Sequence, residues 1–157
     1  MKYILSLISC VVFFLFSGCT SSLSINISDV IDQVYQDLLD PLNEDWLIQA
    51  DTENTAAILG IDVSFLEEAC FYYSSSATNG TAIGGFQMKN EDKTRVLAAL
   101  QEYSQKTSEK FAGFLPDQYN LAQAAEYLDY GTVVFFIMTD RNDDIKQEIE
   151  QIISEQT

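Results

Sequence analysis

A run of six apolar residues, Val133 to Met138, constrains the fold of this 157-residue chain more than any other feature. A strand with one wet face alternates polar and apolar residues, whereas a strand covered on both faces does not. The run therefore predicts a central strand with packed layers on both sides. Tyr127 to Tyr130 predicts its neighbour, and Gly131 marks the turn between them.

A second pair of strands is predicted earlier in the chain, over residues 68–76 and Thr81–Met88. Asn79-Gly80 lies between them, and this dipeptide favours a tight type I′ turn, which needs a positive φ at both central residues. Gly84 and Gly85 weaken the second strand and indicate a bulge or a close backbone approach.

Four helices are predicted from capping residues and helical spacing of apolar side chains. Their limits are Ser28 or Asp29 to Pro41, Asn90 to Gly113, a short helix from Pro116-Asp117, and a terminal helix capped by Asp140 that carries Ile145, Ile149, Ile152 and Ile153. The pattern of residues 44–66 is ambiguous. The expected order is therefore α-β-β-α-α-β-β-α.

Two hairpins with intervening helices predict an α+β fold, a four-stranded, mostly antiparallel sheet packed by helices. A parallel α/β sheet fits less well, because tight hairpins join adjacent antiparallel strands. No repeat, linker or long charge block divides residues 28–157, so we expect a single α+β domain there.

The start of the chain has the pattern of an export signal. Lys2 supplies a positive charge, Tyr3 to Phe16 form an apolar run, and Ser17-Gly18-Cys19 follows. The run is shorter than the about 20 residues that span a membrane, and small residues before a cut are typical of a secretory signal. The cysteine after them resembles the lipobox of bacterial lipoproteins, although Phe16 stands where that pattern prefers leucine.

This resemblance implies a lipoprotein signal peptide over residues 1–18 and lipid attachment, diacylglycerol with fatty acids such as palmitate, at Cys19. Residues 19–27 would then form a lipidated tether. Without residues 1–18 the chain has 139 residues, with 7 basic and 24 acidic side chains and a net charge of −17. Such a charge opposes nucleic-acid binding and adsorption to anionic membranes, so a covalent lipid is the expected link to the membrane.

Five segments of the chain carry a further resemblance: Phe111-Ala112-Gly113-Phe114-Leu115-Pro116-Asp117-Gln118-Tyr119, Tyr130-Gly131 with the run to Ile137, Asp143-Asp144-Ile145, Gly60-Ile61-Asp62 and Ala82-Ile83-Gly84-Gly85-Phe86. In their order and spacing they resemble a family of small lipoproteins of Gram-positive bacteria that is catalogued as a domain of unknown function. The resemblance covers most of residues 58–150. It implies a lipid anchor and a single α+β domain, and it carries over no catalytic residue.

Familiar catalytic and metal-binding patterns are missing. The chain has no histidine, which removes the usual general base and leaves no nitrogen–sulfur zinc set. Cys70 lies in an apolar stretch and is expected to be a small buried hydrophobe. Glu67-Glu68, as strand neighbours, would point to opposite faces. Asp140-Arg141-Asn142-Asp143-Asp144 begins like a calcium loop but lacks its glycine and glutamate, and helix capping explains it better.

We therefore expect a lipid-anchored domain at the extracytoplasmic face of the cell membrane. Its expected role is that of a non-catalytic binding or accessory module for an unknown envelope protein or ligand, with no catalytic, metal or cofactor residues assigned. The alternative is a carboxylate-dependent hydrolase of cell-envelope polymer, because paired carboxylates alone suffice for glycoside hydrolysis.

Overall fold

The run of six apolar residues forms strand β5 (Val133–Met138), and all six side chains are buried. A computed structural model describes residues 25–39, 47–89 and 92–156. β5 lies between two other strands, so its backbone is paired on both edges. The prediction of a central strand covered on both faces is confirmed.

Within the residues that the structure describes, the sheet has five strands, and every neighbouring pair is antiparallel. The other strands are β1 (Leu47–Ala50), β2 (Leu66–Ser74), β3 (Ala82–Met88) and β4 (Glu126–Tyr130), in the spatial order β1-β2-β3-β5-β4. The α+β class with an antiparallel sheet packed by helices is confirmed. The prediction of four strands is wrong, because β1 pairs with β2 at the edge and is too short to show a pattern.

The predicted element order is also wrong, because it lacks two elements in the region that contains β1. Strand β1 and helix α2 (Thr52–Leu59) both lie in the ambiguous residues 44–66, followed by a short 3₁₀ turn, Val63–Phe65. The Asp51 carboxylate caps α2 by accepting from the Asn54 backbone N–H at 2.9 Å. Gly60 ends it with a φ of 68°. These are ordinary helix signals, hidden by the shortness of the helix.

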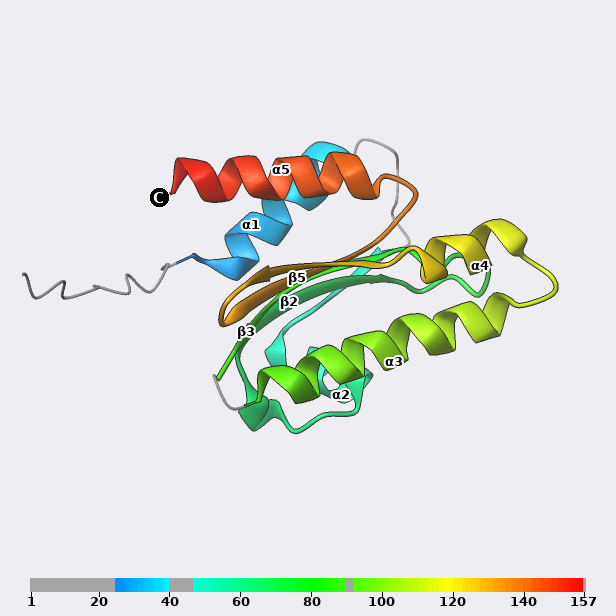
Figure 1. The fold of residues 1–157 in the computed structure, drawn as a ribbon, viewed down its shortest axis with the longest axis horizontal. Helices are drawn as coiled ribbons and strands as arrows, with labels where there is room; N and C mark the ends of the chain where they lie inside the picture. Colours follow the sequence, from blue (N-terminus) through cyan, green and yellow to red (C-terminus); the bar gives the residue numbers. More distant parts are fainter. Residues whose placement is uncertain (1–24, 40–46, 90–91, 157) are drawn as a thin grey trace, which may run out of the picture.

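Helices cover both faces of the sheet (Figure 1). On one face lie α1 (Ile27–Val34), which continues as a π-helical turn over Tyr35–Leu39, and α5 (Asn142–Glu155). On the other lie α2 and α3 (Lys93–Phe111), with α4 (Pro116–Gln123) at the end of the sheet. Alternate residues of β5 enter the two cores, Phe135 and Ile137 on the α1 side and Val134 and Phe136 on the α3 side.

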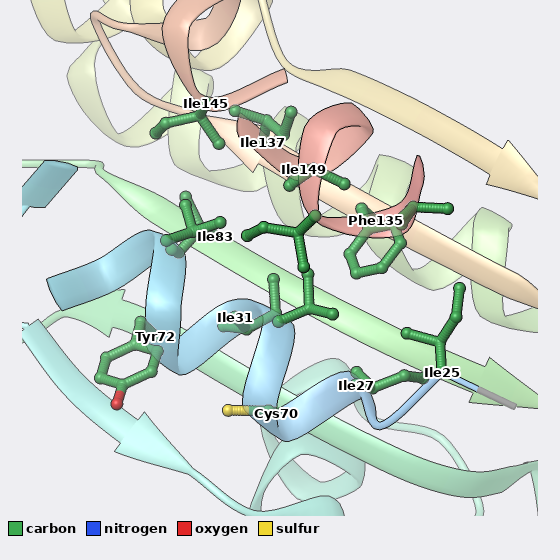
Figure 2. Close-up of a cluster of buried hydrophobic side chains, with 14 of the residues drawn as sticks. Ile25, Ile27, Ile31, Cys70, Tyr72, Ile83, Phe135, Ile137, Ile145 and Ile149 are labelled. Carbon is green, nitrogen blue, oxygen red and sulfur yellow. The ribbon is translucent and has the colours of Figure 1, made fainter. Parts of the chain in front are cut away.

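Helix α1 lies directly on a glycine of the sheet. A Cβ on Gly85 would overlap the Ile27 side chain and lie 3.1 Å from Ile31 Cγ1. Figure 2 shows these isoleucines in one cluster with the α5 side chains Ile145 and Ile149. The close approach expected at Gly84-Gly85 is therefore present, whereas the β-bulge lies at Glu67 in β2.

The first helix begins earlier than expected. Asn26, not Ser28 or Asp29, is its N-cap, and the Asn26 side chain accepts from the Asp29 N–H at 3.2 Å. Ile25 and Ile27 are buried in the core. The end of the expected tether therefore packs with the domain, because these isoleucines complete the α1 side of the core.

The link between β2 and β3 is not the expected tight turn. Seven residues, 75–81, separate the strands, and Gly80 is not among the glycines with positive φ. The Gly80 N–H instead donates to Gln118 Oε1 at 2.8 Å. The type I′ prediction is wrong, because the loop has seven residues and its Gly80 bonds α4 without a positive φ.

The helix limits in the second half follow the sequence more closely. Gly113 has a φ of 86° after the end of α3, and Pro116 is the first residue of α4. Asp140 does not cap α5, which begins at Asn142 after Arg141. The helix end expected at Pro41 and the N-cap expected at Asn90 lie outside the described residues.

Candidate functional site

The segment from Phe111 to Tyr119, which we name the α3–α4 corner, turns the chain from one helix into the next. Phe111 is fully buried at the end of α3. Gly113 adopts the left-handed conformation that lets the chain leave a helix sharply. Pro116 then supplies a preset φ at the first position of α4. The sequence of this segment therefore fixes a helix stop and a helix start within a few residues.

The corner is held to the sheet by the β2–β3 loop. Besides the hydrogen bond from Gly80 to Gln118, the backbone of Gly80 packs against the Phe111 ring. A Cβ on Gly80 would lie 2.9 Å from Phe111 Cε2 and 3.0 Å from Thr107 Cγ2. The corner therefore has a rigid base, although it projects from the end of the molecule (Figure 1).

Two aromatic side chains of this corner face solvent. Phe114 is 60% exposed and Tyr119 is 38% exposed. Tyr119 also lines a hollow of about 350 Å³, which we name the apolar hollow, together with Ala112, Gly113 and Pro116. Exposed apolar side chains grouped around a concavity are typical of surfaces that bind other molecules.

The other side of α4 borders a wider cavity of about 870 Å³, which we name the acidic groove. Among the described residues, five carboxylates line it: Asp117 of α4, Glu126 of β4, and Asp140, Asp143 and Asp144 at the start of α5. Arg141 is the one basic residue among these described lining residues, and it bonds the Asp144 carboxylate at 3.0 Å and the Leu38 carbonyl at 2.7 Å. The groove is therefore strongly negative.

Residues 140–144 begin like a calcium loop in sequence, but their backbone does not form such a loop. Asn142 to Asp144 already belong to α5, so no loop exists there to wrap an ion. Asp143 and Asp144 lie in the first turn, where the helix dipole favours acidic side chains. In the described part of the chain, no group of three or more acidic, cysteine or histidine side chains is arranged to hold a metal ion.

A separate polar cluster lies between α1 and the edge of the sheet. Asp32 Oδ1 accepts from Gln49 Nε2 at 2.8 Å and from the Tyr72 hydroxyl at 3.0 Å. The Cys70 thiol lies 3.6 Å from the same oxygen. Burial raises the pKa of Cys70 to about 12, and burial followed by the bond to Asp32 raises the pKa of Tyr72. Only a thiolate is a strong nucleophile, and the raised pKa keeps the Cys70 thiol protonated. Cys70 is buried, as expected for a cysteine that acts as a small hydrophobic residue.

Glu67 and Glu68 do not alternate as simple strand neighbours. Glu67 is the bulge residue of β2, and its carboxylate accepts from Gln87 Nε2 at 2.8 Å. Gln87 is the residue opposite Glu68. Glu68 itself accepts from the Ser28 backbone N–H at 3.1 Å and the Ser28 hydroxyl at 2.8 Å. The expectation of opposite faces assumed a regular strand, and the bulge removes that regularity.

The predicted lipid-attachment residue, Cys19, lies outside the described residues, as do the predicted signal peptide and most of the predicted tether. Over residues 25–39, 47–89 and 92–156, none of the helices combines the length and apolar character needed to cross a bilayer.

The fold and these surfaces define a small α+β domain with an exposed aromatic corner and an acidic groove. The chain belongs to a family described as a domain of unknown function, DUF4358, whose model matches residues 43–139. Membership in a catalogued domain of unknown function is thus confirmed. No curated protein and no solved structure matches the chain.

The sequence did not single out Phe114 or Tyr119 as site residues, although both lie in the segment that carried the resemblance. The sequence around a phenylalanine that follows a glycine does not indicate whether its ring is exposed or buried. Phe111, three residues earlier, is fully buried.

Proposed function

We propose that this protein is a lipid-anchored extracytoplasmic domain that acts as a non-catalytic binding or accessory module in the cell envelope. The anchor rests on the sequence: a short apolar run, small residues and then Cys19. The family would then be one of small lipoproteins of Gram-positive bacteria. A covalent lipid also suits a chain whose net charge opposes membrane adsorption.

The observation that supports a binding role is the pair of exposed aromatic side chains of the α3–α4 corner, Phe114 and Tyr119, of which Tyr119 lines the apolar hollow. The α3–α4 corner lies at the opposite end of the long axis from the start of α1 (Figure 1). A tether that enters at the α1 end would leave this corner free to reach a partner. Its partner, in this proposal, is another envelope protein.

Site-specific photo-crosslinking in intact cells tests the proposal. A benzophenone amino acid replaces Phe114 in the full chain, and the same replacement at Ile48, which is 45% exposed on β1, is the control. We expect one discrete adduct from position 114 on irradiation and none from position 48. Equal adducts from both positions, or none from either, would contradict a binding role for the corner.

A further inference from the structure

Helix α4 separates two surfaces of different chemistry. Pro116 and Tyr119 face the apolar hollow, whereas Asp117, Asn120 and Leu121 line the acidic groove. An α-helix with its side chains is about 10–12 Å across. An extended segment rises about 3.3 Å per residue, so roughly four residues cross α4 and reach both surfaces.

The carboxylates of the acidic groove are only partly neutralised. Arg141 pairs with Asp144, and Lys146 lies 3.9 Å from Glu126. Within the described residues, the side chains of Asp117, Asp140 and Asp143 form no hydrogen bond or ion pair. Three unpaired acids lie on one side of α4 and the apolar hollow on the other. This arrangement favours a partner that carries cationic side chains close to apolar ones.

We propose that α4 binds a basic, amphipathic segment of a partner protein, with an apolar side chain in the apolar hollow and lysine or arginine side chains in the acidic groove. This inference rests on the proposed binding function and names the chemistry of its partner. Exposed Phe114 and Tyr119 provide the apolar contact, since aromatic side chains dominate interface energies. The acids select the partner by charge complementarity.

Fluorescence anisotropy with model peptides tests this chemistry. The full chain is placed in neutral phosphatidylcholine nanodiscs, with empty nanodiscs as the blank. The probe is a short labelled peptide of alternating lysine and leucine. One matched peptide carries glutamate for lysine, and another carries serine for leucine. We expect the lysine–leucine peptide to bind more tightly than either matched peptide.

Matched variants then locate the binding. Phe114→Ser, and separately Asp140→Asn with Asp143→Asn, should each weaken binding by about tenfold or more. Their controls are Ile48→Ser and Asp29→Asn with Asp37→Asn, which make the same chemical changes elsewhere on the surface and should change the affinity less than about twofold. Phe114→Gln replaces the serine variant if that variant does not melt cooperatively.

Equal weakening by the test and control variants would mean adsorption to the overall negative charge and would overturn the inference. Failure of the lysine–leucine peptide to bind would also overturn it. If position 114 still forms its adduct in cells, the proposed function stands and only the basic partner is wrong. If neither experiment succeeds, both proposals fail.

Discussion

At the scale of single residues, Gly80 is a glycine that the structure requires, but for a different reason from the one that the sequence indicated. The dipeptide Asn79-Gly80 suggested a left-handed turn, yet Gly80 is needed because Phe111 and Thr107 occupy the space of a Cβ. We expect Gly80→Val to destabilise the fold by roughly 1–3 kcal/mol, the usual cost of overpacking. Thermal or urea denaturation measures this cost.

A double-mutant cycle separates the two causes. If the Phe111 ring is the obstacle, Gly80→Val should cost less in a Phe111→Leu background than in the wild type. An equal cost in both backgrounds would mean that the backbone conformation of Gly80, and not the Phe111 ring, opposes the substitution. If Gly80→Val left the melting temperature of the wild type unchanged, the contact itself would be refuted.

Cys70 provides a chemical test at the same scale. Because burial raises its pKa to about 12, it is protonated near pH 8 and should resist iodoacetamide in the folded protein. Alkylation mapped by mass spectrometry should label this cysteine only when urea unfolds the chain. Rapid labelling of Cys70 in the native protein at pH 8 would show that its environment is open.

Several buried groups predict how stability depends on pH. Burial raises the pKa of Tyr103 to about 12 and also raises the pKa values of Cys70, Tyr72 and Tyr127. The unfolded chain releases these protons near pH 8.5 for cysteine and about pH 10 for tyrosine. Raising the pH through these values therefore favours unfolding, and the stabilisation is fully present below them.

We expect the urea midpoint to fall as the pH rises from about 8.5, the pKa of cysteine in the unfolded chain, to about 12, the pKa of buried Cys70 and Tyr103. A Tyr72→Phe, Tyr103→Phe variant should lose less stability over that interval than the wild type. An identical fall in both proteins would assign the alkaline sensitivity to other groups.

At the scale of elements, local signals predicted most of the structure. The two hairpin pairings, α3, α4 and the β4–β5 turn follow from apolar periodicity, glycine and proline. Strand β1 and helix α2 could not be predicted in the same way, because four and eight residues show too little periodicity. The acidic groove joins Asp117 to Asp140 and Asp143 only through the tertiary fold, so no sequence spacing shows it.

The contact of α1 with the sheet yields a prediction about where the domain begins. Gly85→Ala should destabilise the protein by about 1–3 kcal/mol, because its methyl group would overlap Ile27. The cost should shrink in an Ile27→Ala background, since that change makes room. An undiminished cost in chemical denaturation would mean that α1 does not lie on Gly85.

At the scale of the whole molecule, charge is divided between the two helical layers. Helix α1 with its π-helical turn and α5 carry eight acidic residues and one basic residue, whereas α2 and α3 carry three acidic and four basic residues. Near an anionic bilayer, the α1–α5 layer is repelled more strongly, over a screening length of about 8 Å. We therefore expect the α3 layer to face the membrane.

If Cys19 carries the proposed lipid, the packed start of the domain would also keep the molecule close to the bilayer. From Cys19 to buried Ile25 there are six peptide units, which reach roughly 20 Å at most. Fluorophores at Gln101→Cys on α3 and Gln147→Cys on α5 should report the orientation in vesicles with brominated lipids. Stronger quenching from α3 is expected, and stronger quenching from α5 would reverse the orientation.

The fold itself is not expected to be a membrane binder. A lipid-free form that begins at Thr20 carries the net charge of −17, so it should not bind anionic vesicles in a divalent-free buffer. Tight binding in a vesicle sedimentation assay would show that the domain, rather than a lipid, holds the protein at the membrane.

The lipid on Cys19 is the central claim, because the tether, the orientation and the free α3–α4 corner all depend on it. Its most direct test is radiolabelled palmitate incorporation, together with membrane fractionation, in cells that produce the wild type or Cys19→Ser. We predict that the wild type is labelled and sediments with membranes, and that Cys19→Ser is unlabelled and released or mislocalised. Equal labelling, or equally strong membrane partition of the two proteins, would contradict it.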